Sequence, residues 1–149
     1  MYIDELSKFE ELCLIDKALV IEDLELIKSI TEAAYLKDDL SKKLNYETTD
    51  YYEKLPFWSR ILSEMAPKDD VFWFTSDYDD HGVYVGKLDK VLSNVGKVFD
   101  LGVDEVTIIA QSLDTFISFD TYASKGKFFN EVQFYGRYDA LFSKAVIKT

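Results

Sequence analysis

Residues 106–110, with the sequence VTIIA, form an uninterrupted apolar run in the second half of the chain. A short continuous apolar run is typical of a strand that is buried on both faces of a sheet. We therefore predict a central β-strand at residues 106–110, and the rest of the fold is inferred outward from it.

A helix is predicted immediately before this strand. Its apolar residues recur at i, i+4, i+7 and i+11, as expected for one helix face: Leu88, Leu92, Val95 and Phe99. Gly102 follows as a helix terminator would. Further upstream, residues 71–75 (VFWFT) are β-branched or aromatic, which predicts a strand. Together these segments predict a β-α-β passage.

Two more strands are predicted after the central one, at residues 116–122 and 128–135. In the second, Glu131 and Gln133 alternate with Val132 and Phe134, so that the two pairs face opposite sides. Residues 124–127 (SKGK) are expected to form the hairpin turn between the two strands. A short helix is expected around residues 140–146.

The first part of the chain is predicted to be helical up to about residue 66. The longest expected helix covers residues 23–44 and places one set of apolar residues on one side: Leu26, Ile30, Ala33, Leu40 and Leu44. An earlier helix carries an apolar face that includes Cys13, and a short helix is expected from Pro56 to Met65.

These elements predict an α+β fold. We expect a helical N-terminal half, residues 1–66, packed on a mixed β-sheet at residues 67–149, with β-α-β-β-β order and a C-terminal helix. The length of 149 residues fits one domain that spans residues 1–149.

The composition excludes several classes of function. The chain has 17 Lys and Arg against 28 Asp and Glu, a formal net charge of −11. Such a charge disfavours binding to nucleic acid or to anionic membrane surfaces, both of which attract basic proteins. The N-terminus lacks the pattern of a secretory signal, no apolar run approaches the roughly 20 residues that span a bilayer, and there is one cysteine. A cytoplasmic protein is expected.

No motif points to an enzyme. One histidine and one cysteine make hydrolytic triads and most metal centres improbable, and no phosphate-binding glycine loop is present. Residues 77–82 (DYDDHG) resemble the start of a calcium loop, but His81 stands at the fifth position and Leu88 at the twelfth, where oxygen ligands are needed. A metal site using Asp77, Asp79 and His81 is kept as an alternative. So are the carboxylate pairs Asp77 with Asp79 and Asp114 with Asp120.

The acidic charge is concentrated rather than evenly spread. Residues 69–80 contain five carboxylates and neither Lys nor Arg. One explanation is that the charge only keeps the protein dispersed. The other is a docking face for a basic protein, formed in part by Asp69, Asp70, Asp77, Tyr78, Asp79 and Asp80.

In size, charge and mixed α/β make-up, the chain resembles the small acidic immunity proteins of bacterial toxin systems, including those of contact-dependent growth inhibition. This resemblance implies a cytoplasmic protein, not an enzyme and with no cofactor, that binds and neutralises a basic toxin domain, often a nuclease. The alternatives are a small metal-dependent enzyme or metal-binding domain, and an acidic mimic of nucleic acid.

Overall fold

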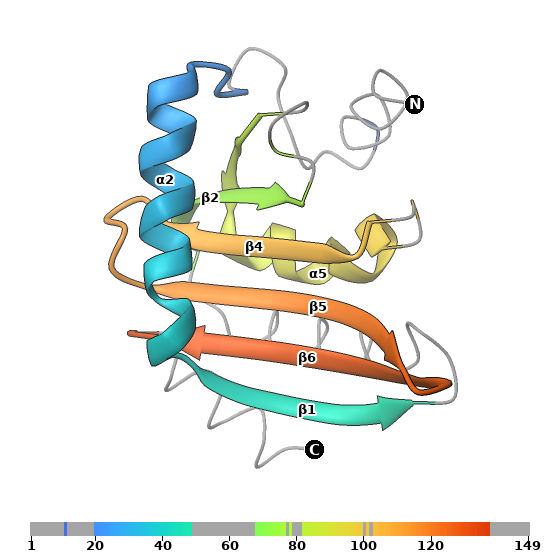
Figure 1. Ribbon diagram of the computed structural model, residues 1–149. Coiled ribbons are helices and arrows are strands. Elements are labelled where there is room, and N and C mark those ends of the chain that lie inside the picture. The colour runs from blue at the N-terminus through green and yellow to red at the C-terminus, as the bar shows by residue number, and fades with distance from the viewer. Residues whose placement is uncertain are drawn as a thin grey trace.

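A computed structural model of the chain describes residues 11, 20–48, 68–76, 78, 82–99, 101 and 103–137. These residues form six strands: β1 (Lys42–Thr48), β2 (Asp70–Thr75), β3 (Tyr84–Lys87), β4 (Glu105–Ala110), β5 (Phe116–Ser124) and β6 (Lys127–Tyr135). The strands make one sheet with the order β1-β6-β5-β4-β2-β3 (Figure 1). Two α-helices, α2 (Leu24–Leu36) and α5 (Leu88–Phe99), and the short 3-10 helix η2 (Asp38–Leu40) complete the described part.

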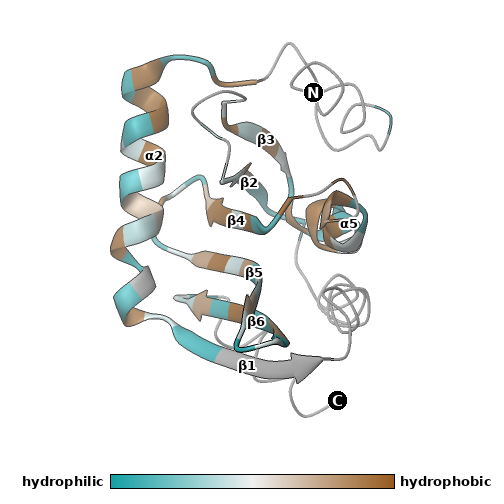
Figure 2. Ribbon diagram, turned by 45° about the vertical axis from the view of Figure 1, so that its right-hand side comes forward, coloured by the Kyte–Doolittle hydropathy of each residue, from teal (hydrophilic) through white to brown (hydrophobic). Residues whose placement is uncertain are grey.

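The two helices lie on opposite faces of the sheet (Figure 2). Successive side chains of a strand point to opposite faces, so each strand contributes to two separate apolar layers. On β2, Val71 and Trp73 pack in the layer that contains α5. Phe72 and Phe74 lie in the layer that contains α2. The sheet is therefore the middle layer of three.

Helix α5 confirms its predicted apolar face, because all four of its predicted positions are buried: Leu88, Leu92, Val95 and Phe99. Beneath it, the Trp73 and Tyr84 rings lie 4.6 Å apart between centroids. Leu88 N donates a 2.8 Å hydrogen bond to the backbone oxygen of Asp69, which satisfies one of the free N–H groups at the helix start.

The predicted strands at 71–75, 106–110, 116–122 and 128–135 are present as β2, β4, β5 and β6. The prediction of a mixed sheet is wrong, because every pair of neighbouring strands is antiparallel. The β-α-β passage predicted from residues 71–75 is interrupted by β3, a strand that was not predicted, so α5 connects β3 to β4. Both of these strands are antiparallel to β2, which lies between them.

The helical N-terminal half packed on a sheet is also wrong. Residues 42–48, which were predicted to lie at and after the end of a helix, form strand β1 and pair with β6 along their whole length. Asp38 and Lys42, and Asp39 and Lys43, are acid–base pairs four residues apart, but such pairs favour a helix by only a few tenths of a kcal/mol. The backbone hydrogen bonds offered by the exposed edge of β6 override this preference. The described part is mostly sheet.

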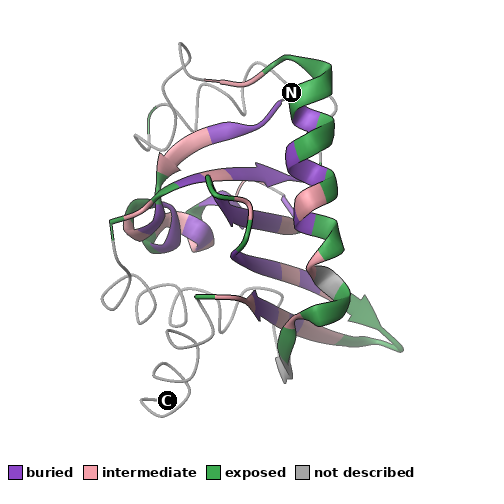
Figure 3. Cartoon of the chain, turned by 90° about the vertical axis from the view of Figure 1, so that its left-hand side faces the viewer, coloured by how far each residue is buried: buried purple, intermediate pink, exposed green. Residues whose placement is uncertain are grey.

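Helix α2 ends at Leu36, and only part of its predicted inner side is confirmed: Ile30 is buried and Ala33 packs against the core. Its buried residues are Ile27, Ile30, Thr31 and Ala34, whereas Leu26 and Leu40, both expected on the inner side, are exposed. Figure 3 shows the buried side of the helix facing the sheet. Branched and small side chains let the helix approach Phe74 and Phe116, and the bulky leucines are left outside.

The turn between β5 and β6 is confirmed. Ser124 and Lys127 are paired, and the two residues between them, Lys125 and Gly126, have φ angles of 52° and 77°. Positive φ at both central residues is what a two-residue type I′ turn requires. This turn fixes the register of the whole hairpin.

Three predicted helices lie outside the described residues: the one that carries Cys13, the one from Pro56 to Met65, and the one at 140–146. Within the residues that are described, no helix has the length and apolar character needed to cross a membrane.

Candidate binding site beside helix α2

Three carboxylates form a row across the middle of the sheet. Asp120 on β5 is directly opposite Glu105 on β4 and directly opposite Glu131 on β6. Alternation along the strands puts all three side chains on the face that also carries α2. Neighbouring strands lie about 4.8 Å apart, so the row brings three like charges within about 10 Å. We call Glu105, Asp120 and Glu131 the acidic row.

The charge environment of the acidic row is strongly negative at its centre. The pKa of Asp120 is raised to about 6. Partial burial is the largest cause, and the nearby carboxylates of Glu105, Glu131 and Asp104 add to it. The hydrogen bond from the Thr121 backbone has the opposite effect on this pKa and is outweighed. The carboxylates that raise the pKa of Asp120 would attract a cation, and Lys43 is the one base among the residues that line the adjoining pocket.

A polar pocket of about 280 Å³ lies between the acidic row and α2. The next register row supplies its floor, with Thr107 opposite Ser118 and Ser118 opposite Gln133. Thr107 Oγ1 donates a 3.1 Å hydrogen bond to Glu105 Oε1, which helps to orient that carboxylate. The complete lining is Tyr35, Lys43, Glu105, Thr107, Phe116, Ser118, Asp120, Glu131 and Gln133. The pocket can hold a polar or cationic group.

An aromatic pair borders the acidic row on its other side. Tyr122 and Phe129 are opposite each other in the register, two residues beyond Asp120 and Glu131. Their rings are stacked, 5.3 Å apart between centroids and 19° from parallel. Both residues are half-buried, so they also offer surface to a partner. Arg and Lys side chains interact favourably with both carboxylates and aromatic rings.

Helix α2 covers only one end of this face of the sheet (Figure 1). Away from α2, no element within the described ranges lies over the acidic row on that side (Figures 1 and 2). The row therefore lies on an accessible face of the described structure.

A second hollow, an apolar groove of about 610 Å³, runs along α2. Its lining residues are Leu24, Ile27, Lys28, Thr31, Glu32, Tyr35, Leu36 and Tyr78. Tyr35 lines both the groove and the polar pocket, so the two hollows adjoin. We call this hollow the α2 groove.

Aromatic contacts position the inner wall of the α2 groove. The buried Phe74 ring is approached edge-on by Tyr35, at 6.1 Å, and by Tyr78, at 5.5 Å between centroids. Tyr78 is held further by its backbone oxygen, which accepts a 2.9 Å hydrogen bond from Gly82 N.

The two sides of the α2 groove, helix α2 and the segment that carries Tyr78, are joined near Ile21 and Val83. Ile21, just before α2, forms an antiparallel bridge with Val83, next to Gly82. Gly82 has a φ of +87°, and a Cβ there would lie 2.5 Å from the backbone oxygen of Ile21. Only glycine fits this conformation and this close approach without strain. The groove is therefore fixed by the fold before any partner binds.

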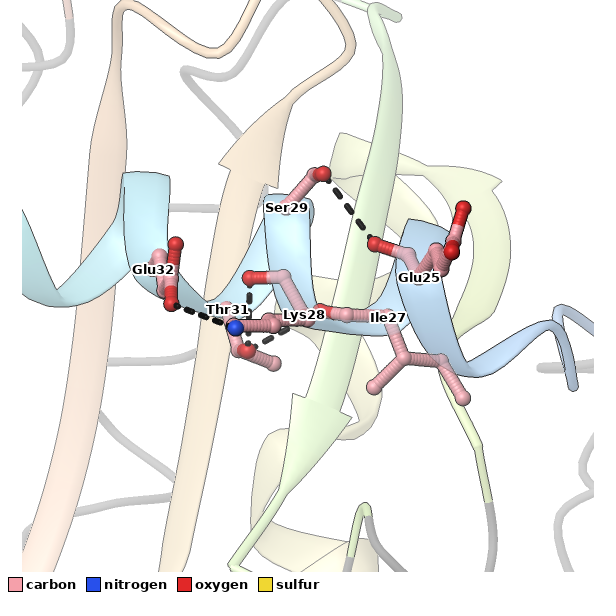
Figure 4. A network of polar contacts seen from close by, with 6 residues as sticks. All are labelled: Glu25, Ile27, Lys28, Ser29, Thr31 and Glu32. Carbon is pink, nitrogen blue, oxygen red and sulfur yellow. Dashed lines mark hydrogen bonds and ion pairs between the residues drawn. The ribbon is translucent and has the colours of Figure 1, made fainter.

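Figure 4 shows the polar contacts within α2, which include those of the groove-lining residues Lys28, Thr31 and Glu32. Lys28 Nζ lies 4.0 Å from a carboxylate oxygen of Glu32, an exposed pair that contributes little to stability. Thr31 Oγ1 donates to the backbone oxygen of Ile27 at 2.9 Å. At the helix start, Asp23 Oδ1 accepts a 2.9 Å hydrogen bond from Leu26 N.

The sequence-predicted docking residues are divided between two places. Asp69 and Asp70 lie together at the start of β2, where their carboxylates face Arg137 at 3.4 Å and Lys87 at 2.5 Å. Tyr78 lies beyond the other end of β2, in the α2 groove. The remaining predicted residues, Asp77, Asp79 and Asp80, and the alternative metal ligand His81, are outside the described residues.

The predicted carboxylate pair Asp114 and Asp120 is not a pair in space. Asp114 precedes β5 and Asp120 is its fifth residue, which places them about 20 Å apart. A hydrogen bond from Ser112 lowers the pKa of Asp114, in contrast to the raised pKa of Asp120. Across the described part of the chain, no three His, Cys, Asp or Glu side chains are arranged to hold a metal ion.

The acidic row was not predicted from the sequence, although the pairing of two of its three residues could have been. Given a two-residue turn at residues 125 and 126, the hairpin register places Asp120 opposite Glu131. Glu105 requires the register between β4 and β5, which a five-residue connection does not specify. Comparisons with protein-family models, with curated proteins and with solved structures found no match.

Proposed function

We propose that the protein binds and neutralises a basic protein partner, as an immunity protein does for the toxin of a bacterial toxin system. The partner's cationic surface would dock on the acidic row and on the aromatic pair Tyr122 and Phe129 beside it. The partner would be a toxin domain, and the best chemical candidate is a nuclease, since its own substrate is a polyanion.

The acidic row is the observation that carries this proposal. Like charges directly opposite each other destabilise a sheet, and here Asp120 has such a neighbour on each side. A local feature that lowers stability, placed on an accessible face, is typical of a functional site. A partner's Arg or Lys side chain would form charge-assisted hydrogen bonds with these carboxylates.

The net charge of −11 supports the same proposal over longer distances. A strongly acidic protein attracts a basic partner before contact, and electrostatic steering can raise association rate constants to about 10⁸–10⁹ M⁻¹s⁻¹ at low salt. Rapid capture suits an inhibitor that must act before its target does.

The docking face is tested with octa-arginine as a probe, by calorimetry at several salt concentrations. We expect E105Q/D120N/E131Q to weaken binding about tenfold or more and to flatten its salt dependence. The matched control is D70N/D89N/D114N, which makes the same change in net charge on other parts of the surface. Equal weakening by both triple variants would assign the binding to net charge alone and would contradict the proposed face.

The inhibitory role is tested by affinity capture from the native host at low and high salt. We expect one stoichiometric basic protein whose own activity is lost on binding and restored by high salt. Failure of E105Q/D120N/E131Q to capture that protein would support the proposed docking face. A captured partner that keeps its full activity in the complex would contradict neutralisation.

A further inference from the structure

We propose that the α2 groove docks one amphipathic, basic helix of the partner protein. The acidic row would hold cationic side chains, and the α2 groove would take the apolar side of this helix. The inference rests on the proposed function for the class of partner, and it adds a second, apolar contact to it.

The first argument is the orientation of α2. Its inner face is filled by the contacts of Ile27, Ile30 and Ala34 with the sheet. Its outer side nevertheless carries large apolar residues that line the groove and have high exposed fractions: Leu24 76%, Leu36 72% and Tyr35 43%. Single exposed leucines are ordinary, but several on one short segment beside a groove mark an interaction surface.

The second argument is the shape of the α2 groove. Leu24 and Leu36 stand at its two ends on the helix, twelve residues apart, which corresponds to about 18 Å along the axis. That length matches about three turns of a second helix. Apolar side chains at i, i+3 or i+4 and i+7 of that helix could reach the groove, as in other complexes where a helix binds in a groove.

The third argument is charge. In sequence, residues 22–39, which contain α2, carry six carboxylates against two bases, and the charged residues that line the groove itself are Lys28 and Glu32. A basic helix is attracted by this excess. A second copy of the same surface would repel itself, because both copies carry the same acidic excess.

The test uses an 18-residue helical peptide of Leu and Lys with the leucines on one face, and a scrambled peptide of the same composition. Binding to the full chain is measured by fluorescence anisotropy. We expect the amphipathic peptide to bind at least tenfold more tightly than the scrambled one, and L24Q/L36Q to remove most of this difference. Glutamine is a good helix former, so these exposed sites keep their helix.

L40Q is the matched control, because Leu40 is similarly exposed but does not line the α2 groove. It should change the affinity less than twofold. Equal binding of the two peptides, or equal binding by the wild type and L24Q/L36Q, would overturn the inference. So would a wild-type dimer, seen by sedimentation, that L24Q/L36Q converts to monomer, since a second copy would then occupy the groove.

Octa-arginine separates this inference from the proposed function, because it has no apolar face. If L24Q/L36Q loses the amphipathic peptide but keeps octa-arginine, and E105Q/D120N/E131Q loses octa-arginine, both proposals are supported. If E105Q/D120N/E131Q still binds octa-arginine with full affinity while L24Q/L36Q no longer binds the amphipathic peptide, the inference about the α2 groove is supported. The proposal that the acidic row is the docking face is then contradicted.

Discussion

The two helices of the described structure cover opposite faces of the same sheet and use their apolar residues in opposite ways. Helix α5 turns every large apolar residue inward, onto Trp73 and the strands beneath it. Helix α2 turns only branched and small residues inward and leaves Leu24 and Leu36 outside. The acidic row and both hollows also lie on the α2 side. One face therefore serves mainly folding, and the other carries the surface available for binding.

The largest expected effect is on the α5 side. Leu92→Ala removes a fully buried side chain and should lower the free energy of unfolding by about 2–5 kcal/mol. Leu36→Ala makes the same chemical change on the outer side of α2 and should change this free energy by less than about 0.5 kcal/mol. Urea denaturation midpoints measure both.

Ile30→Ala tests whether burial, rather than the choice of helix, determines the loss of stability, because Ile30 is on α2 but faces the sheet. It should cost about as much as Leu92→Ala. A large loss from Leu36→Ala would mean that the outer leucines stabilise the fold, and the difference between the two faces would disappear.

The second effect is a pH dependence on the α2 side. The pKa of Asp120 is raised to about 6 in the folded protein, from 3.8 when unperturbed, so between these pH values the native state binds more protons than the unfolded state. This group therefore makes stability fall as pH rises through that window. Asp120→Asn should match the wild type near pH 4 and be more stable at pH 7, by about 1 kcal/mol once solvent screening of this half-exposed carboxylate is considered.

Asp114→Asn should behave in the opposite way. The pKa of Asp114 is lowered by Ser112, so its contribution to stability is present above its unfolded pKa and lost as pH falls through its folded pKa. The variant should be less stable than the wild type at pH 7 and approach it in acid. Urea denaturation at several pH values measures both effects. If both variants change the free energy of unfolding at pH 7 in the same direction, the negative field at the acidic row is contradicted.

The smallest effect concerns how each helix begins. The first turn of α2 is capped by the Asp23 side chain, whereas an N–H at the start of α5 is satisfied by the backbone oxygen of Asp69. Asp23→Ala should cost about 1 kcal/mol, and Asp23→Asn much less, because asparagine also accepts the Leu26 N–H. Amide hydrogen exchange should show faster opening of the first turn of α2 only in the alanine variant.

The same two regions show what the sequence could predict. The regular apolar spacing of α5 and the dense apolar runs of β2 and β4 identify these elements, because one periodicity dominates each of them. Helix α2 has apolar residues on both sides, so periodicity alone does not determine which side meets the sheet. Strand β1 is specified by pairing with β6, about 90 residues away in sequence, and local propensity predicted a helix instead.

The candidate site was less predictable for the same reason. Clusters of acids along the chain pointed to residues 69–80, but the acidic row is assembled from three strands. Strand register brings together charged residues that are far apart in the sequence, so counting acids along the chain does not find them. The exception is a hairpin whose turn is known, because the turn gives the register. Tyr78 was expected in a docking face for its acidic neighbours, and the structure places it in the α2 groove for a different reason, its contact with Phe74.

The division between a folding face and a binding face is tested most directly by mapping the amphipathic Leu and Lys peptide on the isotopically labelled full chain by NMR. We predict amide shift changes along α2, at Tyr78 and across the acidic row, with α5 unchanged. Shift changes centred on α5, or spread evenly over both helices, would contradict the assignment of the α2 side as the binding face.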